Sequence, residues 1–306
     1  MDSNSSSDAV TTSHHSTNIL TPRHLSAGDD NEEPYIYASI RYDPALLRSS
    51  ANAKASFNRP CPFYLLEHQW TRLQVANWSK DRPPNSHGSP SRFMHGLLSA
   101  VVQYQKEHPG SKDTCLRLRI RSYASGQMTS EVSPPRVLTP VNLLFPTTFG
   151  HPDHLPKTEW TIVLDNQPTE TNESTMYKTS DRKPYVRARI SASLTDVEQP
   201  REVLIYNSDG EVLDATKSTP YFFRGGKWLV PASASGGLQG TTRRWTLENG
   251  VASEGVVGKD SLAVGETIWL SNGVWGFYYA KFVALEQGKA PPSEAECRQI
   301  EEQMRG

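Results

Sequence analysis

One lysine, Lys178, lies between two segments that would hold its amine in a fixed place. Upstream, residues 160–164 form an apolar, β-branched run typical of a strand, and downstream residues 185–194 suit a helix that Ser180 or Asp181 could cap. A lysine held in this way can lose its hydration, which lowers its pKa and makes its amine a nucleophile toward a carbonyl. The ordinary alternative is a solvated surface lysine, as most lysines are.

An anion site is indicated further along the chain. Residues 236–248 form a glycine-rich loop that opens a helix, and Gly240, Thr241 and Thr242 stand where the helix begins. The first N–H groups of a helix have no partner within the helix, so they bind anions readily, and threonine hydroxyls can add to them. A glycine-rich loop alone is a weak signal for such a site.

An acid and a second polar turn accompany these features. Asp214 follows an expected strand at residues 201–206 and an Asn-Ser-Asp-Gly turn of the hairpin type, and Ser271-Asn272-Gly273 ends another expected strand. An exposed acid near a turn is the ordinary interpretation of Asp214.

Taken together and in this order, the motifs resemble a known family. The pattern Lys-x-x-x-Arg-x-x-Tyr from Lys178, the acid after a turn, Gly-Thr-Thr-Arg from Gly240 and Ser-Asn-Gly from Ser271 are similar to those of the class IV aminotransferases, a family of pyridoxal-phosphate enzymes. Within that family the fungal type of aminodeoxychorismate lyase matches best. The resemblance extends over residues 34–277.

The resemblance implies roles for particular residues. Lys178 would bond covalently to pyridoxal 5'-phosphate and then act as base and acid, while Arg72, in a His-x-x-x-Arg-Leu segment, would bind the cofactor phosphate. Asp214 stands where the family has a glutamate that keeps the pyridine nitrogen protonated, so the charge is kept and the reach is shorter. Ser39 matches a position that often carries a hydroxyl. The implied cofactor-binding residues are Lys178, Arg72, Asp214, Gly240, Thr241, Thr242, Ser271 and Asn272.

The resemblance also implies an activity and leaves alternatives. A lyase of this type converts 4-amino-4-deoxychorismate to 4-aminobenzoate and pyruvate in folate biosynthesis. A transaminase acting on D- or branched-chain amino acids would share every cofactor residue. A non-catalytic descendant is a second alternative, because Asp214 stands where the family has a glutamate and Trp275 stands where many members carry an arginine. A serine hydrolase is disfavoured because no Gly-x-Ser-x-Gly motif occurs.

Composition limits the partners. The net charge of −1 gives no general attraction to nucleic acid or to an anionic membrane, and no apolar run has the length of a membrane span. The three cysteines have no metal-ligand spacing and indicate a reducing, cytoplasmic location. A metal site at His151, Asp153 and His154 is disfavoured because two prolines interrupt that loop. We therefore expect a small-molecule substrate, no metal and, from the family, a homodimer.

The expected fold is of the α/β (α+β) class, with two domains and the cofactor between them. Residues 1–33 are polar and predict a disordered tail. Residues 34–150 would form the first domain and residues 151–306 the second, which carries Lys178. In the first domain, residues 116–121 alternate strictly between Leu or Ile and Arg, which predicts a half-exposed strand.

Overall fold

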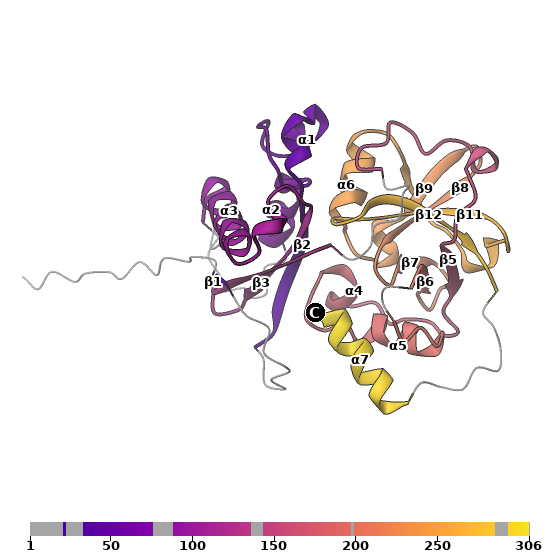
Figure 1. The fold of residues 1–306 in the computed structure, drawn as a ribbon. Coiled ribbons are helices and arrows are strands. Elements are labelled where there is room, and N and C mark those ends of the chain that lie inside the picture. Colours follow the sequence, from indigo (N-terminus) through magenta and orange to yellow (C-terminus); the bar gives the residue numbers. More distant parts are fainter. Residues whose placement is uncertain are drawn as a thin grey trace, which may run out of the picture.

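The computed structural model describes residues 21–22, 33–75, 88–135, 143–196, 199–284 and 293–305. They form two sheets that stand side by side, each with helices of its own (Figure 1). The expected disordered tail, residues 1–33, lies outside the described residues apart from Thr21–Pro22 and Glu33. Thr21–Pro22 form β1, which pairs in parallel with Thr129 and Ser130.

The first sheet has four strands in the order β1-β4-β3-β2. It consists of β1 with β2 (Tyr35–Tyr42), β3 (Leu116–Tyr123) and β4 (Met128–Ser133), and it is accompanied by α1 (Ser50–Lys54), α2 (Leu66–Val75) and α3 (Pro90–Glu107).

Alternation along the strands decides which face of this sheet the helices cover. Ile36, Ala38 and Ile40 of β2 lie in one buried cluster with apolar side chains of α2 and α3. The residues between them therefore point to the opposite face of the sheet. That face carries Tyr37, Ser39 and the arginines of β3, and it is turned toward the second sheet.

The second sheet has eight strands in the order β10-β9-β8-β11-β12-β5-β6-β7. Their bounds are β5 (Thr161–Leu164), β6 (Arg201–Tyr206), β7 (Val212–Ala215), β8 (Thr219–Arg224), β9 (Lys227–Pro231), β10 (Ser253–Gly255), β11 (Thr267–Asn272) and β12 (Gly276–Phe282). The helices of this part are α4 (Glu173–Met176), α5 (Lys183–Ser191), α6 (Thr241–Glu248) and α7 (Glu294–Arg305).

The helix predicted after Lys178 is present as α5, but it begins two residues earlier and ends three residues earlier than expected. Its N-cap is Arg182, whose side chain makes no capping hydrogen bond. Asp181, the residue before the N-cap, makes the side-chain hydrogen bond to the helix start instead: its Oδ1 accepts the N–H of Lys183 at 3.1 Å.

Short single-turn helices complete the described chain at Pro44–Arg48, Pro109–Ser111, Pro152–His154, Ser233–Ser235 and Lys259–Ser261. No helix in the described part of the chain has the length and apolar character that crossing a membrane requires. The domain boundary at residue 150 stays a prediction.

Candidate active site

A cavity of about 140 Å³ lies between the two sheets. Its walls include side chains from β2 and β3 of the first sheet and from β7, β8 and β11 of the second. The C-terminal end of α7, which Figure 1 shows between the two halves, also reaches it. All eight predicted cofactor residues line this cavity: Arg72, Lys178, Asp214, Gly240, Thr241, Thr242, Ser271 and Asn272.

Lys178 is fixed by pairing with the edge of the first sheet. Its carbonyl oxygen accepts the N–H of Tyr37 at 2.8 Å, and the N–H of Ser180 donates to the carbonyl of Tyr35 at 2.7 Å. The amine lies 5.0 Å from the centre of the Tyr37 ring. The sequence predicted that backbone would hold this lysine, and it is held by a strand about 140 residues away in the chain.

The pKa of Lys178 lies well below its ordinary value of 10.5. Burial is the main cause, and nearby guanidinium groups lower the pKa further because they oppose a second positive charge. The contributing groups are Arg72, Arg182, Arg119 and Arg117. A lowered pKa leaves more of the amine neutral near pH 7, which a nucleophile or a base requires.

Asp214 is 3% exposed, and its Oδ1 has no hydrogen-bond partner among the described residues. Burial raises the pKa of this carboxyl well above 3.8, while the N–H of Ala215 and the charge of Arg182 act in the opposite direction. A buried carboxylate oxygen without a partner is costly, so it indicates a cationic or N–H group of a ligand at this position. The alternative of an exposed turn acid is therefore wrong.

Arg72 and the start of α6 are joined through Gln69, a residue that the sequence did not single out. Gln69 is fully buried; its Oε1 accepts from Nη2 of Arg72 at 2.9 Å, and its Nε2 donates to Oγ1 of Thr241 at 3.3 Å. Nε of Arg72 is buried and has no hydrogen-bond partner in the described part of the chain, and burial lowers the pKa of this guanidinium to about 10. Gln69 thus orients a cation and a hydroxyl toward the same end of the cavity.

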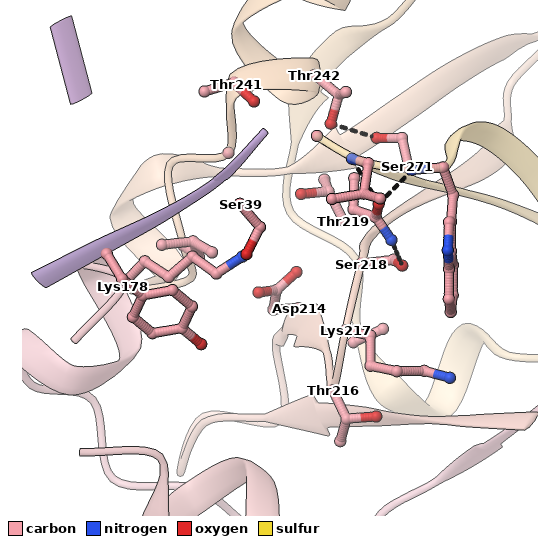
Figure 2. Close-up of a pocket in the computed structure, with 18 of the residues that line it drawn as sticks. Ser39, Lys178, Asp214, Thr216, Lys217, Ser218, Thr219, Thr241, Thr242 and Ser271 are labelled. Atoms are coloured by element: carbon pink, nitrogen blue, oxygen red, sulfur yellow. Dashed lines mark hydrogen bonds between the residues drawn. The ribbon is translucent and has the colours of Figure 1, made fainter. Parts of the chain in front are cut away.

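The helix start predicted as an anion site is at this end. Gly240 is the N-cap of α6 and offers no side-chain cap to the first N–H groups. A Cβ at Gly240 would lie 2.9 Å from Oγ1 of Thr219, so the close approach of these segments requires glycine. Behind the helix start, Oγ of Ser271 donates to Oγ1 of Thr242 at 2.8 Å (Figure 2).

Asn272 shapes the turn between β11 and β12. Its Oδ1 accepts the N–H groups of Val274 at 3.0 Å and Trp275 at 2.8 Å, and its Nδ2 donates to Oγ of Ser218 at 3.2 Å. Both ends of the amide are therefore bonded to the protein. Its direct role is to place Trp275 on the cavity wall.

Two kinds of site residue lay outside the sequence prediction. Arg182 was part of the matched pattern without a role. Its guanidinium stacks 3.5 Å from the centre of the Tyr185 ring, and its Nη2 donates to the carbonyl of Thr216 at 3.4 Å.

Arg117 and Arg119 were expected on a half-exposed face, but they line the cavity, and Arg119 is 5% exposed. The strict alternation of arginine on β3 was the available signal.

Solved structures identify the class of fold. A structure provisionally named as 4-amino-4-deoxychorismate lyase aligns with 92% of this chain and 95% of its own, with a TM-score of 0.58 and 19% identity. The branched-chain amino acid aminotransferase from Escherichia coli aligns with 88% of this chain and 83% of its own, with a TM-score of 0.53 and 12% identity. The mixed α and β architecture expected from the sequence is thereby confirmed.

The chain belongs to the class IV aminotransferase family, a family of pyridoxal-phosphate-dependent lyases and transaminases. The sequence model of that family, described as amino-transferase class IV, matches residues 89–281. A protein of Schizosaccharomyces pombe, named provisionally as an aminodeoxychorismate lyase, is 37% identical over 123 residues, which cover 39% of this chain and 53% of that protein. The aminodeoxychorismate lyase of Saccharomyces cerevisiae is 29% identical over 248 residues, 70% of this chain and 66% of its own. The matched region thus spans about half of the first relative and about two thirds of the second.

Proposed function

We propose that this protein is a pyridoxal-phosphate-dependent aminodeoxychorismate lyase, which converts 4-amino-4-deoxychorismate to 4-aminobenzoate and pyruvate. One observation carries the proposal: the Lys178 amine and the unpartnered Oδ1 of Asp214 face a single cavity whose other end holds Arg72 and the start of α6. The names of the two fungal relatives support the choice of the lyase reaction.

The residues present fit pyridoxal phosphate. Asp214 Oδ1 is a buried acceptor with no partner among the residues that the structure describes, as a protonated pyridine nitrogen would require. Nε of Arg72 is a buried donor with no partner within the described ranges, and α6 begins at the same end of the cavity, as a phosphate would require. When bound, the cofactor supplies an electron-withdrawing ring that makes the C–H bond beside a substrate amine acidic.

Lys178 performs the proton transfers in this proposal. Its amine, of which the lowered pKa leaves a larger share neutral, takes the proton from the ring carbon that bears the substrate amino group. The bond from the neighbouring ring carbon to the enolpyruvyl oxygen then breaks, and the ring becomes aromatic. The leaving enolpyruvate gains a proton at its methylene carbon and departs as pyruvate. Lys178, with the hydroxyl of Ser39 on the same cavity wall, supplies that proton.

A product assay tests the reaction. The protein, incubated with pyridoxal phosphate, is supplied with 4-amino-4-deoxychorismate, and 4-aminobenzoate and pyruvate are quantified. Equal amounts of both products support the lyase. Amino transfer from a D- or branched-chain amino acid to an oxo acid, without 4-aminobenzoate, would instead identify a transaminase. A protein that bound no cofactor and gave neither product would be the non-catalytic descendant.

We further propose that the chain works in the cytoplasm as a homodimer. The location is supported by Cys61, Cys115 and Cys297, which form no disulfide among the described residues. The dimer is supported by the family resemblance alone. Light scattering coupled to size-exclusion chromatography measures the mass, and a value of one chain at micromolar concentration contradicts the dimer.

A further inference from the structure

The amine of Lys217 lies against two indole rings at one wall of the cavity. Nζ is 5.1 Å from the centre of the Trp160 ring and 5.0 Å from that of Trp275. The two rings contact each other edge to face, with centres 5.5 Å apart at an angle of 64°. Aromatic faces attract a cation electrostatically, so they restrict this flexible side chain.

The backbone around Lys217 is held from behind by a buried carboxylate. Glu202 is fully buried; its Oε2 accepts the N–H of Lys217 at 2.9 Å, and its Oε1 accepts the hydroxyl of Ser218 at 2.9 Å. The hydroxyl of Tyr278 also donates to Oε1. The N–H of Thr216 donates to the carbonyl of Val203 at 3.0 Å. The segment that carries Lys217 is therefore rigid, as a binding group should be.

This cation is separate from the groups assigned to the cofactor. Figure 2 shows Asp214 between the amines of Lys178 and Lys217, and Thr241 and Thr242 lie at another end of the site. Lys217 and Trp275 both line the cavity.

We propose that Lys217 binds the ring carboxylate of the substrate, with the Trp275 indole beside the substrate ring; this inference rests on the proposed function. In 4-amino-4-deoxychorismate the ring carboxylate lies opposite the amino group, so it points away from the reacting end near Lys178. An ammonium group and a carboxylate form a strong, charge-assisted hydrogen bond. An indole face offers contact area to the flat ring.

A binding experiment tests the assignment without requiring turnover. Protein loaded with pyridoxal phosphate is titrated calorimetrically with 4-aminobenzoate and with its neutral amide, 4-aminobenzamide. We expect the wild type to prefer the acid by roughly 10- to 100-fold and Lys217→Met, which keeps the apolar stem, to lose that preference. Lys259→Met is the matched control, because Lys259 lies 5.9 Å from the Tyr206 ring outside the cavity. A Lys217→Met protein that still preferred the acid as the wild type does would overturn the proposal.

Steady-state kinetics distinguish this proposal from the proposed function. Lys217→Met should raise KM by about 10- to 100-fold and change kcat by less than about threefold, and Lys217→Arg should restore KM. If the wild type makes no 4-aminobenzoate but its preference for the acid depends on Lys217, the lyase reaction is wrong and the carboxylate site stands. A wild type that binds acid and amide equally overturns the carboxylate site, whatever its activity.

Discussion

The carbonyl oxygen of Lys178 accepts the N–H of Tyr37 at 2.8 Å, and the amine of the same lysine lies 5.0 Å from the centre of the Tyr37 ring. One residue of the first sheet thus fixes both the backbone and the side chain of a residue from the second part of the chain. The position of the amine consequently depends on the contact between the two halves. The reactivity of Lys178 should be sensitive to changes on that contact surface.

Asp214→Asn should separate the role of the carboxylate in binding from its cost in folding. Asparagine keeps the shape and removes the charge, so affinity for pyridoxal phosphate should fall by about 10- to 100-fold. Without cofactor, the variant should be more stable by about 1–3 kcal/mol at neutral pH, because burial of this carboxyl opposes the ionisation that it undergoes freely in the unfolded chain. Cofactor titration and thermal unfolding measure the two effects. Asp209→Asn, in the exposed turn before β7, is the control and should change neither.

The pH dependence gives the sign of the same effect. The pKa of Asp214 in the folded protein lies above 3.8, its ordinary value in an unfolded chain. At a pH between the unfolded and the folded pKa, the carboxyl is ionised in the unfolded chain and protonated in the folded protein. Stability from this group is present at low pH and is lost as the pH rises through that interval. The advantage of Asp214→Asn should therefore vanish below about pH 4. An advantage that grew toward low pH would contradict the burial of this carboxyl.

Gln69→Ala should weaken the phosphate end of the site. The change removes the acceptor of Arg72 and the donor to Thr241, so affinity for pyridoxal phosphate should fall by about 10-fold. Affinity for pyridoxal, which has no phosphate, should stay the same. Thr71→Ala, a neighbour on α2 whose hydroxyl bonds the carbonyl of Glu67, is the control. Equal losses for both compounds would mean that Gln69 supports the fold and does not act through the phosphate.

Gly273→Ala should disturb the contact between the halves. A Cβ at this position would lie 2.6 Å from Nε2 of Gln69 and 2.9 Å from the carbonyl of Ser39, so these groups must move. We expect a loss of about 1–3 kcal/mol in the free energy of unfolding, together with weaker cofactor binding. Gly258→Ala, where nothing lies within 4 Å of the added atom, is the matched control in denaturant unfolding. Equal stability of the two variants would contradict the close packing.

The activity should depend on pH through Lys178. Because burial and four guanidinium groups hold the pKa of this amine well below 10.5, kcat/KM should level off well before that pH. Arg119→Gln removes one of the positive charges, so the pKa of Lys178 should rise and the acidic limb of the profile should move to higher pH. A limb that did not move would mean that Arg119 has no influence on this amine.

Much of the site was predictable because its parts are local. The lysine before a proline-containing helix, the Asn207–Gly210 turn and the glycine-rich start of α6 each depend on residues within one short segment, and all three are present. The family order of these motifs then indicated that they meet in one site.

The remainder depends on contacts between distant segments. Arg117 and Arg119 were expected to be half exposed because alternation reveals two faces of a strand and not what covers each face. The second sheet covers the arginine face and turns it into a cavity wall. Gln69 and Lys217 gave no signal, since a glutamine in a helix or a lysine in a turn is ordinary until its neighbours are known.

The visible absorbance spectrum of the purified protein with pyridoxal phosphate, for the wild type and for Lys178→Ala, tests the central claim most directly. The wild type should show the band of a lysine-bound cofactor, and borohydride should fix the cofactor to a peptide that contains Lys178. The variant should show only the spectrum of the free cofactor. A variant that kept the lysine-bound band, or a wild type without it, would contradict the assignment of Lys178.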